Sequence, residues 1–351
     1  MAKRVLSMIL VLVMLCSVTG CANGKETRYE ASFLELFDTV TKIVGYAKNE
    51  EEFTEYTQLI YDELKVYHEL YDIYHDYDGI NNIKTINDNA GIKPVKVDQK
   101  IIDLIKFSKE TYKLTGGKTN VALGSVLTMW HDYRERGTDD PENASLPPMD
   151  ELKERAEHTN IDDVILDEEE STVYLKDPEM SLDVGSVGKG YATEQVSKDL
   201  KEKGYAHVML SVGGNLKAVG TKLTDNNEEI PWSAGIQNPD MKSENTNLYI
   251  LNLEDYCLVT SGVYQRYYTV DGKQYHHIID PNTLMPSDYF LSVSIICRDS
   301  GMADVLSTAL FSMSYEDGLK YIEKLEDTQA LWVFKDGSMK YTNGFEEMIK
   351  K

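Results

Sequence analysis

The spacing of apolar residues predicts amphipathic helices in the first half of this 351-residue chain. After Asn49, apolar side chains recur at intervals of three and four, which places them on one face of a long helix. The residues on this face are Phe53, Tyr56, Ile60, Leu64, Tyr67, Tyr71 and Tyr74. The same pattern predicts two more helices, one between a cap at Asp98 and a stop at Gly116, the other over 150–158.

From Ile161 onward the pattern changes to short β-branched segments separated by turns. Helices are predicted in this half at about 191–203 and 301–314, and a hairpin is predicted around Gly337. One candidate strand, Val40–Ala47, precedes the long helix. Helices first, followed by strands with interspersed helices, indicate an α+β fold rather than regular βαβ winding.

The first twenty residues have the layout of an export signal. Lys3 and Arg4 precede an apolar run over 5–18 that is short for a membrane span. The run ends in Val-Thr-Gly-Cys21, which resembles a bacterial lipobox, in which a signal peptidase cuts before the Cys and the thiol is lipidated. An ordinary signal peptide with a chance Cys is the alternative. We therefore expect a membrane-anchored lipoprotein on the extracytoplasmic face, divided into a signal peptide at 1–20, a lipidated Cys and tether at 21–31 and one catalytic unit at 32–351.

Composition limits the ligands that this chain can bind. The net charge is −23, and such an acidic chain argues against nucleic-acid binding, because phosphate contacts need a basic surface. An anionic ligand would have to be held by local backbone amides or by a bound cation. Cys257 and Cys297 lie in apolar stretches and are expected to be buried thiols, with a disulfide as the alternative.

A glycine-rich segment over 182–192 is the first of four clusters with candidate chemistry. Its pattern predicts a turn that leads from a strand into a helix. At such a turn, glycines let backbone amides approach phosphate oxygens closely. It is not a Walker A loop, because Asp183 stands where the first Gly belongs and Gly190 replaces the Ser or Thr. A tight connection without a ligand is the alternative reading.

Three more clusters follow. A Gly-Gly-Asn turn lies within 210–216, and the segments 260–267 and 275–281 flank a hairpin signal at Asp271-Gly272. In the fourth cluster, Asp304 and Thr308 are four residues apart on a predicted helix, so both oxygens can reach one hard cation. Alternatively, the Asp is an acid near a helix N-terminus and the Thr bonds back to a helix carbonyl.

Taken together, these clusters resemble the ApbE family of FAD:protein FMN transferases. Family members carry a segment like Asp-Leu-Gly-Gly-Ile-Ala-Lys-Gly-Tyr-Ala, matched here by 183–192. Gly-Gly-Asn, Thr-Ser-Gly-x-Tyr-x-Arg-Tyr, His-Ile-x-Asp-Pro and Ala-Asp-x-x-Ser-Thr follow in the family's order. The first half agrees more loosely, since Lys-Thr-Asn at 118–120 stands where Ala-Phe-Asp is usual.

The resemblance implies a T-fold-related α+β unit with mixed, mostly antiparallel sheets and packed helices. It also implies an Mg²⁺-dependent enzyme that moves FMN from FAD onto a Thr or Ser hydroxyl of a membrane-associated redox protein, releasing AMP. By matching residue to residue, the metal ligands are Ser186, Asp304 and Thr308. The implied FAD contacts are Phe37, Tyr74, Lys118, Thr119, Asn120, Asp183, Lys189 and Ile279.

His277 is the candidate general base, because an imidazole can accept the proton of a hydroxyl near neutral pH. Strand alternation is expected to send His276 to the opposite face. Two other functions use the same features. In an Mg²⁺-dependent FAD pyrophosphatase, water replaces the hydroxyl and FMN and AMP are released. A non-catalytic flavin-binding lipoprotein would need the pocket but not Asp304, Thr308 or His277.

Overall fold

The computed structural model describes residues 25–351. The predicted signal peptide and Cys21 lie outside these residues, and their roles stay predictions. Within 25–351, no helix is both long and apolar enough to cross a bilayer.

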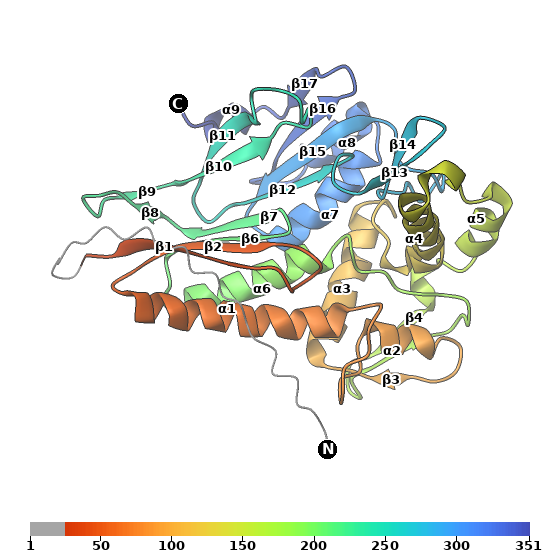
Figure 1. Cartoon of the computed structure of the whole chain (residues 1–351). Coiled ribbons are helices and arrows are strands. Elements are labelled where there is room, and N and C mark those ends of the chain that lie inside the picture. The colour runs from red at the N-terminus through yellow and green to blue at the C-terminus, as the bar shows by residue number, and fades with distance from the viewer. Residues whose placement is uncertain (1–24) are drawn as a thin grey trace.

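An eight-stranded sheet forms the centre of the fold, and every pair of neighbouring strands in it is antiparallel (Figure 1). Its strands, in spatial order, are β1 (Thr27–Phe33), β2 (Thr41–Ala47), β6 (His207–Val212), β7 (Asn215–Gly220), β12 (Cys257–Gly262), β15 (Phe290–Cys297), β16 (Gln329–Phe334) and β17 (Met339–Tyr341). Cys257 and Cys297 face each other on β12 and β15 as buried free thiols, with their Sγ atoms 3.8 Å apart.

Helices cover one face of this sheet (Figure 1). They are α1 (Glu50–Tyr71), α3 (Gln99–Leu114), α6 (Gly188–Glu202), α7 (Ser300–Phe311) and α8 (Tyr315–Ile322). α1 begins where the Asn49 side chain accepts the Glu52 N–H at 2.9 Å. Its apolar face packs with α3 and α6 against β2 and β6 in one core, and α7 packs against β12 and β15 in a second core.

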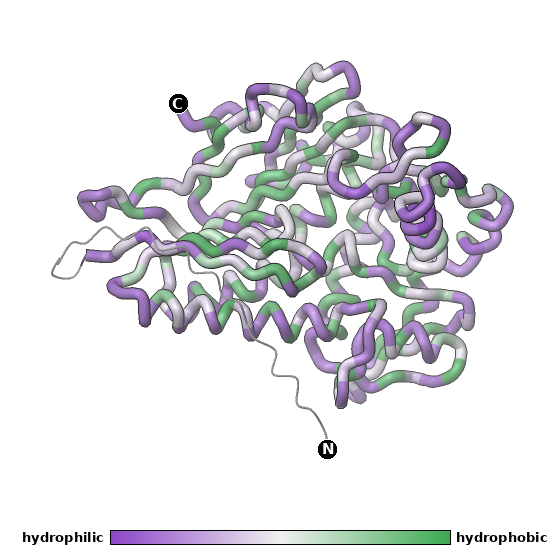
Figure 2. Tube along the Cα trace, viewed as in Figure 1, coloured by the Kyte–Doolittle hydropathy of each residue, from purple (hydrophilic) through white to green (hydrophobic). Residues whose placement is uncertain are grey.

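The other face of the sheet is covered by a hairpin and a short helix. These are β10 (Trp232–Gln237), β11 (Asn247–Leu253) and α9 (Phe345–Met348). Trp232, Leu251 and Phe345 meet Leu258 of the sheet in a third apolar cluster. Apolar residues therefore line both faces of the central strands, while polar positions gather on the outer turns (Figure 2).

Smaller elements lie around the sheet, most of them at the end of the molecule where α3 lies (Figure 1). They are α2 (Ile83–Asp88), β3 (Val95–Lys96), α4 (Gly124–Asp139), α5 (Met149–Ala156), β4 (Val164–Asp167), β5 (Thr172–Leu175), β8 (Lys222–Leu223), β9 (Glu229–Ile230), β13 (Tyr267–Val270) and β14 (Lys273–His276). α4 packs against β13, and Trp130 of α4 donates a hydrogen bond of 2.9 Å to the Leu284 carbonyl.

Most of the predicted elements are present. The candidate strand before the long helix is β2, the helices predicted near 191 and 301 are α6 and α7, and the hairpins at Asp271-Gly272 and Gly337 both form. The α+β class with largely antiparallel sheets is confirmed. α4 was not predicted.

The predicted tether at 21–31 is wrong at its C-terminal end, because β1 begins at Thr27 and pairs with β2 along its full length. Tyr29 stacks on Phe53 with ring centroids 5.2 Å apart, and Ala31 and Phe33 are buried. These three apolar residues alternate with polar ones, which is the period of a strand that is buried on one face. The folded unit therefore includes residues 27–31.

Two other predicted boundaries also differ. The long helix ends at Tyr71, since Asp72 has extended dihedral angles, so Tyr74 lies beyond it. The glycine-rich turn does not follow a strand. Instead, the Asn87 side chain accepts the Leu182 N–H at 2.7 Å and donates to the Leu182 carbonyl at 3.0 Å, in place of a neighbouring strand.

Candidate active site

Asp304 is a buried carboxylate on α7 that contacts the glycine-rich segment. Its Oδ2 atom accepts hydrogen bonds from the Gly190 N–H and from Nδ2 of Asn215, each at 2.8 Å. Residue 190 has to be glycine, because a Cβ there would lie 2.3 Å from the Ser300 carbonyl oxygen. Oδ1 of Asp304 makes no hydrogen bond within residues 25–351. One carboxylate oxygen is thus left for a ligand.

The surroundings of Asp304 suit a hard cation. Burial raises the pKa of Asp304, and the charge of Lys189 opposes this shift. A carboxylate that burial destabilises gains from a bound cation. Thr308 lies one turn further along α7 and is partly exposed, and Ser186 lies in the turn before α6.

No group of three or more His, Cys, Asp and Glu side chains within 25–351 could hold a metal. A cation at Asp304 would therefore rest on one carboxylate and on neutral oxygens. Mg²⁺ accepts this type of donor set, because it keeps several waters and binds substrate phosphates. The residues present fit the predicted metal.

The segment 118–120 is tied to the same region, but its side chains are already engaged. Lys118 pairs with Asp280 at 2.9 Å between Nζ and Oδ1, and Thr119 Oγ1 donates to the Val305 carbonyl of α7 at 3.1 Å. The Asn120 side chain accepts the Ala122 N–H at 2.9 Å. The Thr119 and Asn120 side chains are thus held by bonds within the protein.

His277 directly follows β14 and is oriented by one carbonyl. Its backbone N–H and its Nδ1 lie 3.1 Å and 3.2 Å from the Arg266 carbonyl oxygen. Because that oxygen can only accept, Nδ1 carries the proton and Nε2 presents a lone pair. Burial, together with the charges of Arg266 and Arg134, lowers the pKa of His277 to about 3, although its hydrogen bond opposes this shift. The ring is neutral near pH 7.

His276 has a different environment. Its Nε2 donates to the Ser287 carbonyl at 2.7 Å, its Nδ1 accepts the Ile278 N–H at 3.2 Å, and its ring packs edge-on against Phe311. Both ring nitrogens are therefore occupied, and this residue fixes the end of β14. Ile279 is buried nearby and pairs with Pro286.

The positive charges of two arginines that the sequence analysis did not single out, Arg134 and Arg266, act on His277. Burial, and then the like charge of Arg266, lower the pKa of Arg134. Neither guanidinium forms a salt bridge within the part of the chain that the structure describes. Burial raises the pKa of Tyr74 to about 12, the charge of Asp183 adds to this shift, and the charges of Arg134 and Arg266 oppose it. Neighbouring arginines without a carboxylate partner are suited to an anionic ligand.

Phe37 and Tyr74, the predicted flavin contacts, are linked by a chain of hydrogen bonds. The Phe37 N–H donates to Nδ1 of His68 at 3.2 Å, and Nε2 of His68 lies 3.3 Å from the Tyr77 hydroxyl. Tyr77 donates to Oδ2 of Asp72 at 2.8 Å, and Oδ1 of Asp72 accepts the Tyr74 N–H at 2.6 Å. This chain of hydrogen bonds fixes the position of Phe37 relative to Tyr74, although they are 37 residues apart in the sequence.

The family model described as "ApbE family" matches residues 37–332. The chain belongs to the ApbE family. The FAD:protein FMN transferase of Klebsiella pneumoniae (strain 342) is 30% identical over 261 residues, covering 73% of this chain and 76% of that protein. The one of Treponema pallidum (strain Nichols) is 30% identical over 278 residues, covering 76% and 75%.

Solved ApbE structures share the fold. The crystal structure of the ApbE protein from Thermotoga maritima has a TM-score of 0.80 at 25% identity, covering 93% of this chain and 100% of that chain. The flavin transferase ApbE from Vibrio cholerae has a TM-score of 0.74 at 21% identity, covering 92% and 100%.

Proposed function

We propose that this protein transfers FMN from FAD to a Thr or Ser hydroxyl of an acceptor protein and releases AMP. Membership in a family of flavin transferases supports the proposal. The observation that carries it in this chain is His277, whose ring the Arg266 carbonyl holds in one tautomer and on which the charges of Arg134 and Arg266 both act. This arrangement provides positive charge for a pyrophosphate and a base for a hydroxyl.

The reaction forms a bond between the acceptor oxygen and the phosphorus of the FMN half. The anhydride P–O bond breaks, and AMP leaves with the bonding electron pair. Nε2 of His277 accepts the hydroxyl proton, while the Arg266 carbonyl holds the ring in the required tautomer. When the phosphates of FAD contact Arg134 and Arg266, their negative charge offsets the arginines, so the basicity of His277 increases.

Asp304, Thr308 and Ser186 are the residues that would hold Mg²⁺ in this proposal, the last through its carbonyl. A bound Mg²⁺ neutralises charge on the pyrophosphate. Asp183 and Lys189 would contact FAD, since both belong to the segment that packs on Asp304. Phe37 and Tyr74 would flank the isoalloxazine ring, because aromatic faces suit stacking.

We also propose that Cys21 is lipidated and holds the domain on the extracytoplasmic face of a membrane, near a membrane-associated redox acceptor. The lipobox-like residues before Cys21 support this placement. Membrane fractionation of wild type and Cys21→Ser tests it, because loss of the lipid should release the domain or block processing.

The transfer is tested by incubating protein that begins at residue 22 with FAD, Mg²⁺ and a candidate acceptor protein. We expect an FMN mass increase on the acceptor and an equal amount of AMP. Free FMN and AMP without labelled acceptor would instead identify an FAD pyrophosphatase. FAD that stays intact would identify a binding protein.

A further inference from the structure

The β13–β14 hairpin has a hydrogen-bond pattern that determines which backbone groups face outward. Its turn residues Asp271 and Gly272 both have positive φ, 49° and 77°, as in a two-residue type I′ turn. Such a turn is closed by a hydrogen-bonded pair, here Val270 and Lys273. At the other end, the His277 N–H donates to the Arg266 carbonyl.

Along antiparallel strands, pairs of residues that are hydrogen-bonded to each other alternate with pairs that are not. Counting from the turn and counting from His277 identify the same hydrogen-bonded pairs. The residues of β14 that bond to β13 are Lys273 and Tyr275. The N–H and C=O groups of Gln274 and His276 therefore point away from β13. Within residues 25–351, no other strand pairs with this side of β14, and these groups have no backbone partner.

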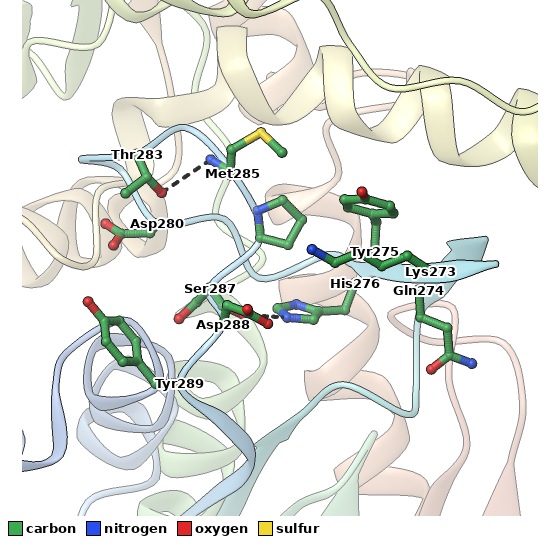
Figure 3. Close-up of a pocket in the computed structure, with 11 residues that line it drawn as sticks. Lys273, Gln274, Tyr275, His276, Asp280, Thr283, Met285, Ser287, Asp288 and Tyr289 are labelled. Carbon is green, nitrogen blue, oxygen red and sulfur yellow. Dashed lines mark hydrogen bonds between the residues drawn. The ribbon is translucent and has the colours of Figure 1, made fainter. Parts of the chain in front are cut away.

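The neighbouring chain covers this edge only beyond the end of β14. There the Ser287 N–H donates to the Ile278 carbonyl at 3.0 Å, and Pro286 pairs with Ile279. Toward Tyr289 the chain diverges from β14, and a cavity of about 450 Å³ opens between the two segments (Figure 3). His276 is among the residues that line it, and its ring is directed toward Ser287 (Figure 3).

We propose that an extended segment of the acceptor protein adds to β14 in this cavity and pairs with Gln274 and His276. The inference rests on the proposed transfer of FMN to a protein. The unpaired N–H and C=O groups repeat every second residue, about 6.8 Å apart, and a polypeptide strand has the same repeat. An unpaired strand edge is normally protected, and this one ends at the candidate base His277.

The geometry also positions the acceptor hydroxyl. Side chains of Tyr275 and His277 lie on the same face of the hairpin, because alternate residues of a strand share a face. A residue opposite this end of β14 would have its Cβ about 5 Å from that of its cross-strand neighbour. A Thr or Ser on the face of His277 would then direct its hydroxyl toward Nε2.

Gln274→Pro tests the proposal because it removes the outward N–H without removing a bond to β13. Gln274→Ala also removes the side chain but keeps the N–H, so the difference between the two variants isolates the backbone bond. We expect kcat/KM for the acceptor protein to be at least about tenfold lower in Gln274→Pro than in Gln274→Ala. FAD affinity, measured by quenching of flavin fluorescence, should be equal in both.

A second experiment leaves the enzyme unchanged. Synthetic acceptor peptides are N-methylated at one backbone position at a time, and their flavinylation by the full-length protein is measured. Strand addition predicts an alternating pattern, in which methylation hinders transfer at every second residue before or after the hydroxyl. This experiment remains decisive if Gln274→Pro lowers folding yield.

Equal acceptor kcat/KM in the Pro and Ala variants, or an N-methyl scan without alternation, would overturn the inference. A Gln274→Pro variant that changes the protein from dimer to monomer with unchanged transfer would assign the edge to a second copy of this chain instead. If wild-type protein labels no acceptor at all, the proposed function has failed before the edge is considered.

Discussion

The backbone N–H of Phe37 donates a hydrogen bond to Nδ1 of His68. A ring nitrogen that accepts has no proton, so the proton of His68 is on Nε2 and points to the Tyr77 hydroxyl. Although burial opposes it, hydrogen bonds from the Tyr74 N–H and the Tyr77 hydroxyl hold the pKa of Asp72 below its usual range. The two predicted flavin contacts therefore depend on one ionised carboxylate.

Tyr77→Phe should weaken FAD binding by about three- to tenfold, because it removes one hydrogen bond to a carboxylate and frees His68 and Phe37 to shift. Flavin fluorescence quenching measures the affinity. Tyr341→Phe is the matched control, since Tyr341 on the distant strand β17 donates a hydrogen bond of 2.6 Å to Glu346 of α9. Equal effects of the two variants on FAD affinity would show that the Asp72 network does not position the flavin.

Asp304→Asn should lower turnover at least about 100-fold while keeping the fold, because the amide retains an acceptor for Gly190 and Asn215 but loses the charge that a cation needs. The raised pKa of Asp304 means that its ionised form destabilises the folded state above the unfolded pKa of about 4. The variant should therefore unfold at the same or a higher temperature in the absence of metal.

Added Mg²⁺ separates a metal ligand from a residue that only packs. A ligand that binds the folded state raises the unfolding temperature. Wild type should gain stability on titration with MgCl₂, and Asp304→Asn should not. If the variant splits FAD as fast as wild type in saturating Mg²⁺, Asp304 is not a ligand of the catalytic metal.

His277→Gln should depress transfer by about 100-fold or more with FAD affinity retained, because a group that takes the proton of the incoming hydroxyl contributes mainly in the transition state. His276→Gln should reduce stability rather than the rate of transfer per folded molecule, since both of its nitrogens hold the end of β14. The opposite ranking of the two variants in transfer would assign the base to His276.

The lowered pKa of His277 also predicts acid sensitivity. The unfolded chain binds a proton at this residue below about pH 6.5, whereas the folded chain does so only near pH 3. Stability linked to His277 is complete above pH 6.5 and is lost as the pH falls, by up to about 2 kcal/mol at pH 5. Urea unfolding at pH 7 and pH 5 should show a smaller loss in His277→Gln than in wild type.

Arg134→Gln should weaken FAD binding about tenfold and reduce its dependence on salt, because the guanidinium supplies charge to the pyrophosphate in the proposed site. Arg136→Gln is the control on the same helix, where the guanidinium lies over the Tyr133 ring at 4.3 Å. Titrations at low and high NaCl provide the measurement. If Arg134→Gln binds FAD as tightly as Arg136→Gln and wild type do, Arg134 does not contact the phosphates.

The parts of the site that the sequence could predict are those carried by short local motifs. Asp304 and Thr308 share a helix face, as their spacing indicated. The glycine-rich segment was expected to approach a ligand closely, whereas at Gly190 the close approach is to α7. Asn215 belonged to a recognised turn, yet its bond to Asp304 joins positions 89 residues apart. Such a contact depends on how β7 and α7 pack, which periodicity does not encode.

Arg134 was missed because α4 was missed. Gly124 and Gly137 lie at the two ends of this helix, and few of its residues are apolar, so its pattern is weak. Gly137 is required by packing, since a Cβ there would lie 2.6 Å from the Tyr268 ring. From the net charge, we expected backbone amides or a bound cation to hold an anionic ligand. A net charge says nothing about local charge, so it did not indicate Arg134 and Arg266.

The pairing of β2 with β6 has a consequence for how the chain reaches its native state. Thr41 is opposite Val212, so the hairpin of β1 and β2 is complete long before its partner strand has been synthesised. Until then one edge of β2 is unpaired and can bind other nascent chains. Folding is also slowed, because pairing β2 with β6 closes a long loop of the chain. Substitutions that weaken the pairing of β2 with β6, such as Ile43→Thr or Leu210→Thr, should reduce the yield of soluble protein during expression. The specific activity of the molecules that do fold should fall far less.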